Sequence, residues 1–187
     1  MGRTILVTGG RRSGTREVAE QVARSLGVRV FRILTADDPA DASWPTRPLG
    51  MHWRTTTAPR NLLTALPRES RETAVLIDCL TVWAGNRLVA LGDPSGTDWD
   101  TRVKSLTTQL VDEVSRVIRR ARQGKWSLVL VLNEIDGESA GAEHLGQAYR
   151  LLVEELDESV RAAVDGVYAV VGGLPYEVKQ TRRLQTV

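Results

Sequence analysis

An apolar segment that runs into a glycine-rich turn is the feature that most limits what this chain can fold into. Residues 4–8 are apolar or β-branched, Gly9 and Gly14 bracket the turn, and an amphipathic pattern begins at Val18. This order predicts a buried strand, a tight turn and a helix that packs on the sheet. Such a turn is typical of a phosphate-binding loop, G-x-x-x-x-G-K-[ST], in which backbone N–H groups surround the phosphates.

Two positions of the turn depart from that motif. Thr15 stands where the motif has lysine, and Arg16 stands where it has the hydroxyl that holds Mg²⁺. No shift of frame recovers the lysine, because the first lysine of the chain is Lys104. One interpretation is a turn whose glycines serve only to reverse the chain, and the other is a nucleotide-binding loop. The residues of that predicted loop are Gly9, Gly10, Arg11, Arg12, Ser13, Gly14, Thr15 and Arg16.

Further apolar segments alternate with helical patterns along the rest of the chain. We expect strands near residues 28–34, 74–80, 127–134 and 166–173, and helices over 61–66, 81–91, 101–122 and 142–163. This alternation predicts an α/β fold of three layers, α/β/α, around a mainly parallel sheet. The pattern of residues 28–34 indicates a strand with one exposed face, while 37–59 is predicted to be a long loop and the residues after 173 a polar tail.

The size and composition of the chain limit its class and its partners. A length of 187 residues with 42% hydrophobic content suits one domain, residues 1–187. No apolar run is long enough to span a membrane, and the absence of a targeting segment predicts the cytoplasm. The net charge of +2 predicts no nucleic-acid partner. Cys79 is expected to be a buried thiol, and His52 and His144 lack the companions of a structural metal site.

Polar side chains follow two of the expected strands, where ligands bind in such sheets. Asp78 closes one strand, and Asn133 and Glu134 close another. In nucleotidases with a phosphate-binding loop, an aspartate in this position helps to hold magnesium, so Asp78 is the predicted catalytic and Mg²⁺-binding carboxylate. The alternative is that Asp78 caps the following helix, a role that Thr81 would serve as well.

Three separated segments match one known family in order and in composition. They are Gly9-Gly10-x-Arg12-Ser13-Gly14, then Leu76-Ile77-Asp78-Cys79-Leu80-Thr81-x-Trp83-x-x-Asn86, then Asn133-Glu134 followed by Tyr149-Arg150 and Gly173-Leu174-Pro175. Trp53-Arg54-Thr55 resembles a fourth family segment. On these residues the chain resembles the bifunctional adenosylcobinamide kinase and adenosylcobinamide-phosphate guanylyltransferase family of cobalamin biosynthesis.

The resemblance implies a fold, a reaction and an assembly. It implies a P-loop NTPase domain of the RecA-like kind, GTP or ATP as donor, Mg²⁺, a corrinoid side-chain alcohol as acceptor, and a homo-oligomer of three chains. It also implies substrate or second-site roles for Trp53, Arg54, Asn133 and Glu134.

The departures from the family fall where its chemistry takes place. The family carries Lys-Ser where this chain has Thr15 and Arg16, and its guanylylated histidine has no counterpart within residues 37–51. Losing the lysine removes a charge that positions the transferred phosphoryl group. Losing the histidine removes the covalent route. We therefore expect a divergent member, or pseudoenzyme, that lacks the standard bifunctional activity.

Three functions remain open from the residues alone. The first is that the chain binds a nucleotide with Arg11, Arg12 or Arg16 in place of the lysine, because arginine clamps phosphate in bidentate fashion. Alternatively, it is a non-catalytic homologue that serves as a binding, regulatory or scaffold protein. The third possibility is an enzyme acting on another small molecule, with Glu134, Asp136 and Glu138 as acid-base or metal groups; otherwise these three form a solvated acidic loop.

Overall fold

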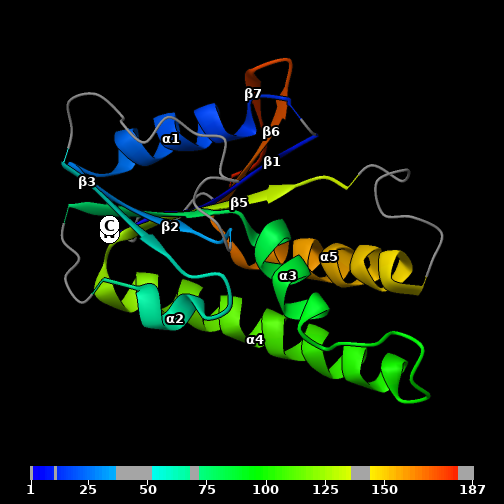
Figure 1. Ribbon diagram of the computed structural model, residues 1–187. Coiled ribbons are helices and arrows are strands. Elements are labelled where there is room, and N and C mark those ends of the chain that lie inside the picture. The colour runs from blue at the N-terminus through cyan, green and yellow to red at the C-terminus, as the bar shows by residue number, and fades with distance from the viewer. Residues whose placement is uncertain (1, 11, 37–51, 68–71, 136–143, 181–187) are drawn as a thin grey trace.

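A seven-stranded sheet lies at the centre of the computed structural model, with helices on both of its faces (Figure 1). The structure describes residues 2–10, 12–36, 52–67, 72–135 and 144–180. The strands are β1 (Thr4–Gly9), β2 (Arg29–Leu34), β3 (His52–Thr57), β4 (Thr73–Asp78), β5 (Ser127–Asn133), β6 (Gly166–Val171) and β7 (Leu174–Gln180). The helices are α1 (Thr15–Leu26), α2 (Leu62–Ala65), α3 (Leu80–Val89), α4 (Trp99–Gly124) and α5 (His144–Ala163).

The sheet has the order β3-β2-β4-β5-β1-β6-β7, and only β7 runs antiparallel to its neighbour. The predicted mainly parallel α/β/α fold is therefore confirmed. β5 lies between β1 and β4, and Gly9 is the register partner of Asn133. The carboxyl ends of β1, β4 and β5 consequently meet at one edge of the sheet, where Gly9, Asp78 and Asn133 end their strands.

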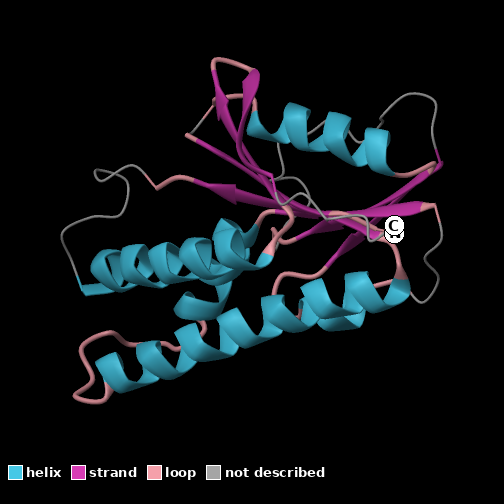
Figure 2. Cartoon of the chain, turned by 180° about the vertical axis from the view of Figure 1, so that it is seen from behind, coloured by secondary structure: helices cyan, strands magenta, loops and turns pink. Residues whose placement is uncertain are grey.

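Two separate apolar layers cover the faces of the sheet. Helix α1 packs on one face through Val18, Ala19 and Ala23, and α2 to α5 cover the other face (Figures 1 and 2). The central strands are buried on both faces, and this explains why their sequences are uninterrupted apolar runs rather than alternating ones. Cys79 is buried within the layer under α1, as predicted.

Two strands lie where the sequence predicts none. His52–Thr57, part of the predicted loop, is β3 and pairs in parallel with β2; residues 37–51 of that loop lie outside the described residues. Leu174–Gln180, predicted to be a polar tail, is β7. Gly172 and Gly173 connect β6 to β7 with φ values of 58° and 80°, the geometry that a two-residue hairpin turn requires.

The prediction that the strand of residues 28–34 has one exposed face is wrong. Arg32 is only 3% exposed, because α1 covers this face of β2 and because β2 lies between β3 and β4. The sequence pattern correctly marks position 32 as polar, but the Arg32 side chain is buried against Glu20 and not exposed to solvent.

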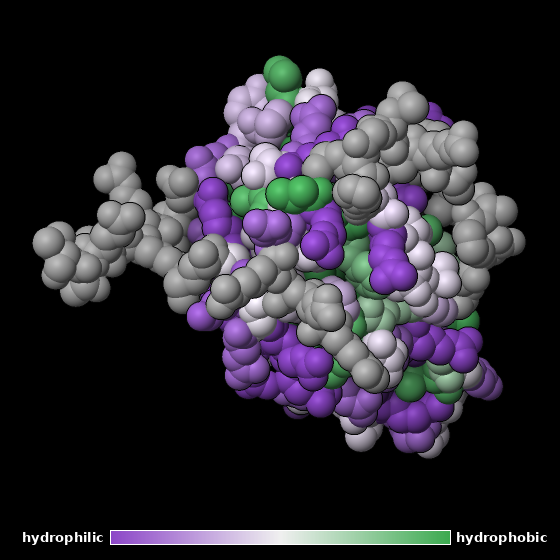
Figure 3. Space-filling view, turned by 90° about the vertical axis from the view of Figure 1, so that its left-hand side faces the viewer, coloured by the Kyte–Doolittle hydropathy of each residue, from purple (hydrophilic) through white to green (hydrophobic). Residues whose placement is uncertain are grey.

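The molecular surface is mostly polar on the side seen in Figure 3, where apolar residues form small separate groups. Among the described helices, none has the length and apolar character that a membrane crossing needs.

Candidate functional site

The turn between β1 and α1 is compact and is held by its own backbone. The N–H of Ser13 donates to the carbonyl of Gly10 at 3.1 Å. Arg12 and Gly14 both have left-handed backbones, with φ of 62° and 88°. Helix α1 begins directly afterwards at Thr15. Among the described residues, no side chain caps the first N–H groups of α1.

The β6–β7 turn packs against this loop, a contact that the sequence did not predict. The N–H of Gly173 donates to the carbonyl of Ser13 at 2.8 Å. A Cβ on Gly14 would lie 3.0 Å from Cα of Gly173, and a Cβ on Gly9 would lie 2.7 Å from the carbonyl oxygen of Val170. Glycine is thus required on steric grounds at both ends of the loop. The glycine spacing alone gives no hint of the chain segment that packs there.

The residue in the lysine position of the motif points into the protein. Thr15 is 4% exposed, and its hydroxyl lies 2.6 Å from the hydroxyl of Ser13. Arg12 is exposed, and Arg11 lies outside the described residues. Thr15 therefore supplies neither the charge nor the reach of a lysine.

Arg16 and Asp78 are brought together across the sheet edge. Nε of Arg16 donates to Oδ1 of Asp78 at 3.2 Å, with side-chain exposures of 31% and 6%. Helix α1 packs over β5 and β4, so Arg16 in its first turn lies close to the carboxyl end of β4, where Asp78 is the last residue. Burial raises the pKa of Asp78, while the guanidinium groups of Arg16 and Arg32 lower it. The N-cap position of α3 is occupied by Cys79, and the hydroxyl of Thr81 accepts from the N–H of Asn133 instead, so neither Asp78 nor Thr81 is the N-cap residue of this helix.

A second ion pair continues the polar row along α1. Arg16, Glu20 and Arg24 recur every four residues and so share one helix face. Glu20 contacts Arg32 of β2 at 3.3 Å and Arg24 at 3.4 Å. The guanidinium of Arg24 lies 5.4 Å from the ring centre of Trp53 on β3. This row links the loop to β3, and the sequence signal for it was the i, i+4 charge pattern of the helix.

Asn133 anchors the carboxyl end of β5 to the neighbouring helices. The hydroxyl of Thr81 accepts from the N–H of Asn133 at 2.8 Å, and the amide of Asn133 donates to Sγ of Cys79 at 3.5 Å. Tyr149 of α5 donates its hydroxyl to the carbonyl of Thr81 at 3.1 Å. Burial raises the pKa of Tyr149 to about 12 and also raises the pKa of Cys79.

The other predicted residues divide between the two ends of the sheet. Glu134 lies beside the loop, because its N–H donates to the carbonyl of Gly9 at 3.0 Å. Trp53 and Arg54 lie near the start of β3, at the amino end of the sheet, since Trp53 is in register with Val30. The structure therefore brings Glu134 to the loop and does not bring Trp53 or Arg54 there. Asp136 and Glu138 lie outside the described residues.

The surroundings of Asp78 do not fit a magnesium ion. Such an ion needs about six oxygen ligands, drawn from carboxylates, hydroxyls, water and phosphate. Here a guanidinium already contacts Asp78, and the hydroxyls of Ser13 and Thr15 contact each other.

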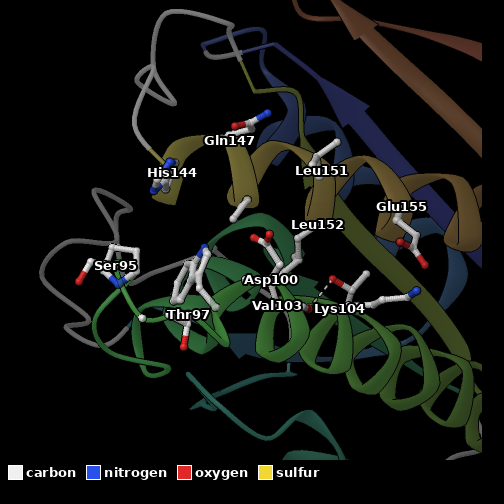
Figure 4. A pocket seen from close by; sticks show the side chains of 15 residues that line it. Ser95, Thr97, Asp100, Val103, Lys104, His144, Gln147, Leu151, Leu152 and Glu155 are labelled. Carbon is white, nitrogen blue, oxygen red and sulfur yellow. Dashed lines mark hydrogen bonds between the residues drawn. The ribbon is translucent and has the colours of Figure 1, made fainter.

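A hollow of about 780 Å³ lies between α4 and α5, on the face of the sheet opposite α1 (Figure 4). The labelled side chains around it come from both helices and from the segment before α4. They are Ser95, Thr97, Asp100, Val103, Lys104, His144, Gln147, Leu151, Leu152 and Glu155. It contains none of the predicted site residues, so the loop remains the candidate site.

A comparison with protein families matches residues 5–178 to the family described as cobinamide kinase / cobinamide phosphate guanyltransferase. The chain belongs to this family. Among curated members, it is 28% identical to the bifunctional adenosylcobalamin biosynthesis protein CobU of Salmonella typhimurium over 94% of this chain and 99% of that protein. It is 30% identical to CobP of Pseudomonas aeruginosa over 93% of this chain and 96% of that protein. The resemblance predicted from the sequence is confirmed.

Solved structures support the fold of this cobinamide kinase family member. An ATPase from the type III secretion system of pathogenic bacteria matches with a TM-score of 0.53 and 14% identity; the match covers 95% of this chain and 57% of the ATPase. A Pyrococcus horikoshii protein matches with a TM-score of 0.51 and 9% identity, covering 97% and 88%. The predicted P-loop NTPase fold is therefore confirmed.

Proposed function

We propose that this protein is a divergent family member that binds GTP or ATP at the loop of residues 9–16 and lacks the standard bifunctional activity. The observation that carries the proposal is the ion pair between Arg16 and Asp78, at 3.2 Å. This pair places the guanidinium of Arg16 in the first turn of α1, where the family has a hydroxyl. The lysine position is occupied by a buried threonine, Thr15.

Nucleotide binding is supported by the backbone of the loop. The left-handed backbones of Arg12 and Gly14 give the loop a curvature typical of anion-binding concavities, in which the N–H of Ser13 is taken up by the carbonyl of Gly10 and the neighbouring N–H groups are left for phosphate. The N-terminus of α1 adds its positive dipole end to the same place. Arg12 and Arg16 supply two guanidinium groups, each suited to phosphate.

Loss of the standard activity is supported by the missing groups. Kinase chemistry depends on charges held against the transferred phosphoryl group, and each such group contributes a few kcal/mol to the rate. Thr15 contributes none. The guanylyl step of the family uses a histidine that has no counterpart in residues 37–51.

The proposal also includes a corrinoid acceptor and a single functional domain over residues 1–187. It assigns substrate or second-site roles to Trp53, Arg54, Asn133 and Glu134.

A homo-oligomer of three chains is a further part of the proposal. It is supported by apolar side chains on the edge hairpin: Val171, Leu174 and Tyr176 are 65%, 61% and 55% exposed. By the pairing of β6 with β7 they share one face of the sheet.

Calorimetric titration with GTP and ATP, followed by an assay with cobinamide as acceptor, tests the proposal. The expected result is saturable binding of a nucleotide with neither phosphorylation nor guanylylation of cobinamide. Absence of binding at millimolar nucleotide would refute the binding role, and transfer to cobinamide would refute the loss of activity. Nucleotide consumption with a different acceptor would instead favour the repurposed enzyme, for which Glu134 beside the loop is the specific observation.

A further inference from the structure

Arg16 stands where a P-loop nucleotidase holds its magnesium ion. In that class, the hydroxyl after the lysine and the aspartate at the end of a nearby strand both hold the ion. In this chain, Nε of Arg16 lies 3.2 Å from Oδ1 of Asp78, so a guanidinium contacts the carboxylate directly. We propose that Arg16 replaces the magnesium ion and that the loop binds nucleoside triphosphate without a divalent cation; this inference rests on the nucleotide binding proposed above.

The guanidinium of Arg16 has N–H groups that do not contact Asp78 and can donate to phosphate. Its Nε is directed at Asp78, and within the part of the chain that the structure describes its other N–H groups have no hydrogen-bond partner. The side chain is 31% exposed and belongs to the first turn of α1, adjacent to Gly14. Arginine presents its donors as a planar fork, so one edge can be fixed by a carboxylate while another receives phosphate oxygens. Asp78 therefore acts as a positioning residue for Arg16.

The same geometry works against a bound magnesium ion. An ion on Asp78 would lie within a few ångströms of the guanidinium, and two positive charges repel strongly at such a distance in a partly buried site. Magnesium also requires oxygen ligands at about 2.1 Å in octahedral geometry. The hydroxyls of Ser13 and Thr15 contact each other at 2.6 Å, and Thr15 is buried.

The ligand chemistry follows from this charge arrangement. The metal-free triphosphate offers its full negative charge and all its oxygens to Arg16 and to the loop N–H groups. A nucleotide already complexed to magnesium offers fewer free oxygens and brings a cation toward Arg16. The loop is therefore selective for the metal-free form of GTP or ATP.

Titration of the full-length protein with GTP and with ATP, in EDTA and in millimolar magnesium chloride, tests this inference. We expect a Kd in EDTA that is at least about threefold lower than the Kd in magnesium. If the two Kd values differ by less than this, or if magnesium lowers the Kd, the inference is overturned while nucleotide binding stands. If no binding is seen in either buffer, the proposed function itself fails, and the inference fails with it.

Variants of Arg16 separate its role from general effects on the helix. Arg16→Ser restores the family hydroxyl, and we expect it to weaken binding in EDTA by about tenfold and to make binding stronger when magnesium is added. Arg16→Lys keeps the charge without the fork, and we expect its binding in EDTA to be weaker than that of the wild type and stronger than that of Arg16→Ser. The matched control is Arg24→Ser, two turns further along the same face of α1, which should bind as the wild type does. Unchanged binding of Arg16→Ser in EDTA would overturn the inference, and circular dichroism establishes that each variant is folded.

Discussion

Arg32 on β2 and Glu20 on α1 form a buried ion pair at 3.3 Å. Arg32 is 3% exposed, and its Nε has no hydrogen-bond partner within the described residues. Burial raises the pKa of Glu20 above its ordinary value of 4.5, whereas the charges of Arg32 and Arg24 lower it. The two charges thus depend on each other, because removal of one leaves the other uncompensated in a poorly solvated layer.

Replacement of Arg32 by methionine should destabilise the fold by about 3 kcal/mol at neutral pH, since the Glu20 carboxylate loses its main partner. The loss should shrink in acid. Without Arg32 the folded-state pKa of Glu20 rises further, and a raised pKa gives stability that is present below 4.5 and lost as the pH rises through the folded value. Urea denaturation at several pH values between about 4.5 and neutrality measures both effects.

A double variant controls for the change in packing. Arg32→Met with Glu20→Met removes both charges, and we expect its stability to return close to that of the wild type. Equal losses in the single and double variants at every pH would mean that the packing of Arg32, and not its charge, is what matters.

Local patterns predicted much of this fold. The apolar runs, the glycine spacing around Gly9 and Gly14, and the carboxylate at Asp78 were readable because each depends on neighbours within a few residues. The link between Asp78 and the loop was predicted in outline from the rule that parallel strands end at one edge.

Contacts between distant segments were not predictable from those patterns. Arg32 is a polar residue, yet its side chain is buried, because the strand order places β2 between two neighbouring strands of the sheet. The sequence around Arg32 does not reveal this position. β3 is an edge strand with little apolar signal, so its existence depends on the partner that it joins. In β7, Leu174, Tyr176 and Val178 do alternate with other residues, a strand signal that the prediction of a polar tail overlooked. The contact between Arg16 and Asp78 follows from the packing of α1 over β5 and β4, which no local spacing reveals.

Removal of the Tyr149 hydroxyl should cost about 1 kcal/mol, because its hydrogen bond to the carbonyl of Thr81 is lost in a half-buried setting. The folded-state pKa of about 12 exceeds the ordinary 10, so the stabilising effect is complete below pH 10 and is lost as the pH rises through 12. The difference between wild type and Tyr149→Phe in urea denaturation should therefore shrink above pH 10. Tyr176→Phe, at a residue 55% exposed, is the control and should change stability by less than about 0.5 kcal/mol.

A charge on the edge hairpin should dissociate the proposed homo-oligomer. Tyr176→Glu places a carboxylate among Val171 and Leu174, and burial of that charge at a subunit contact is unfavourable. Light scattering coupled to size-exclusion chromatography should give the mass of one chain for this variant and a multiple of it for the wild type. Val89→Glu, at a residue 65% exposed near the end of α3, is the control and should leave the mass unchanged. A wild-type mass of a single chain would contradict the oligomer directly.

Restoration of the two family residues should recover part of the kinase chemistry. The double variant Thr15→Lys with Arg16→Ser returns a charge for the phosphates and a hydroxyl for the metal, and each such group is worth a few kcal/mol in phosphoryl transfer. We expect phosphorylation of cobinamide to rise by about 10²-fold or more over the wild-type background, and only in the presence of magnesium. Thr15→Lys alone should give less, because Arg16 still contacts Asp78. If the double variant binds nucleotide with magnesium but transfers no phosphate, the defect lies in acceptor binding rather than in the loop.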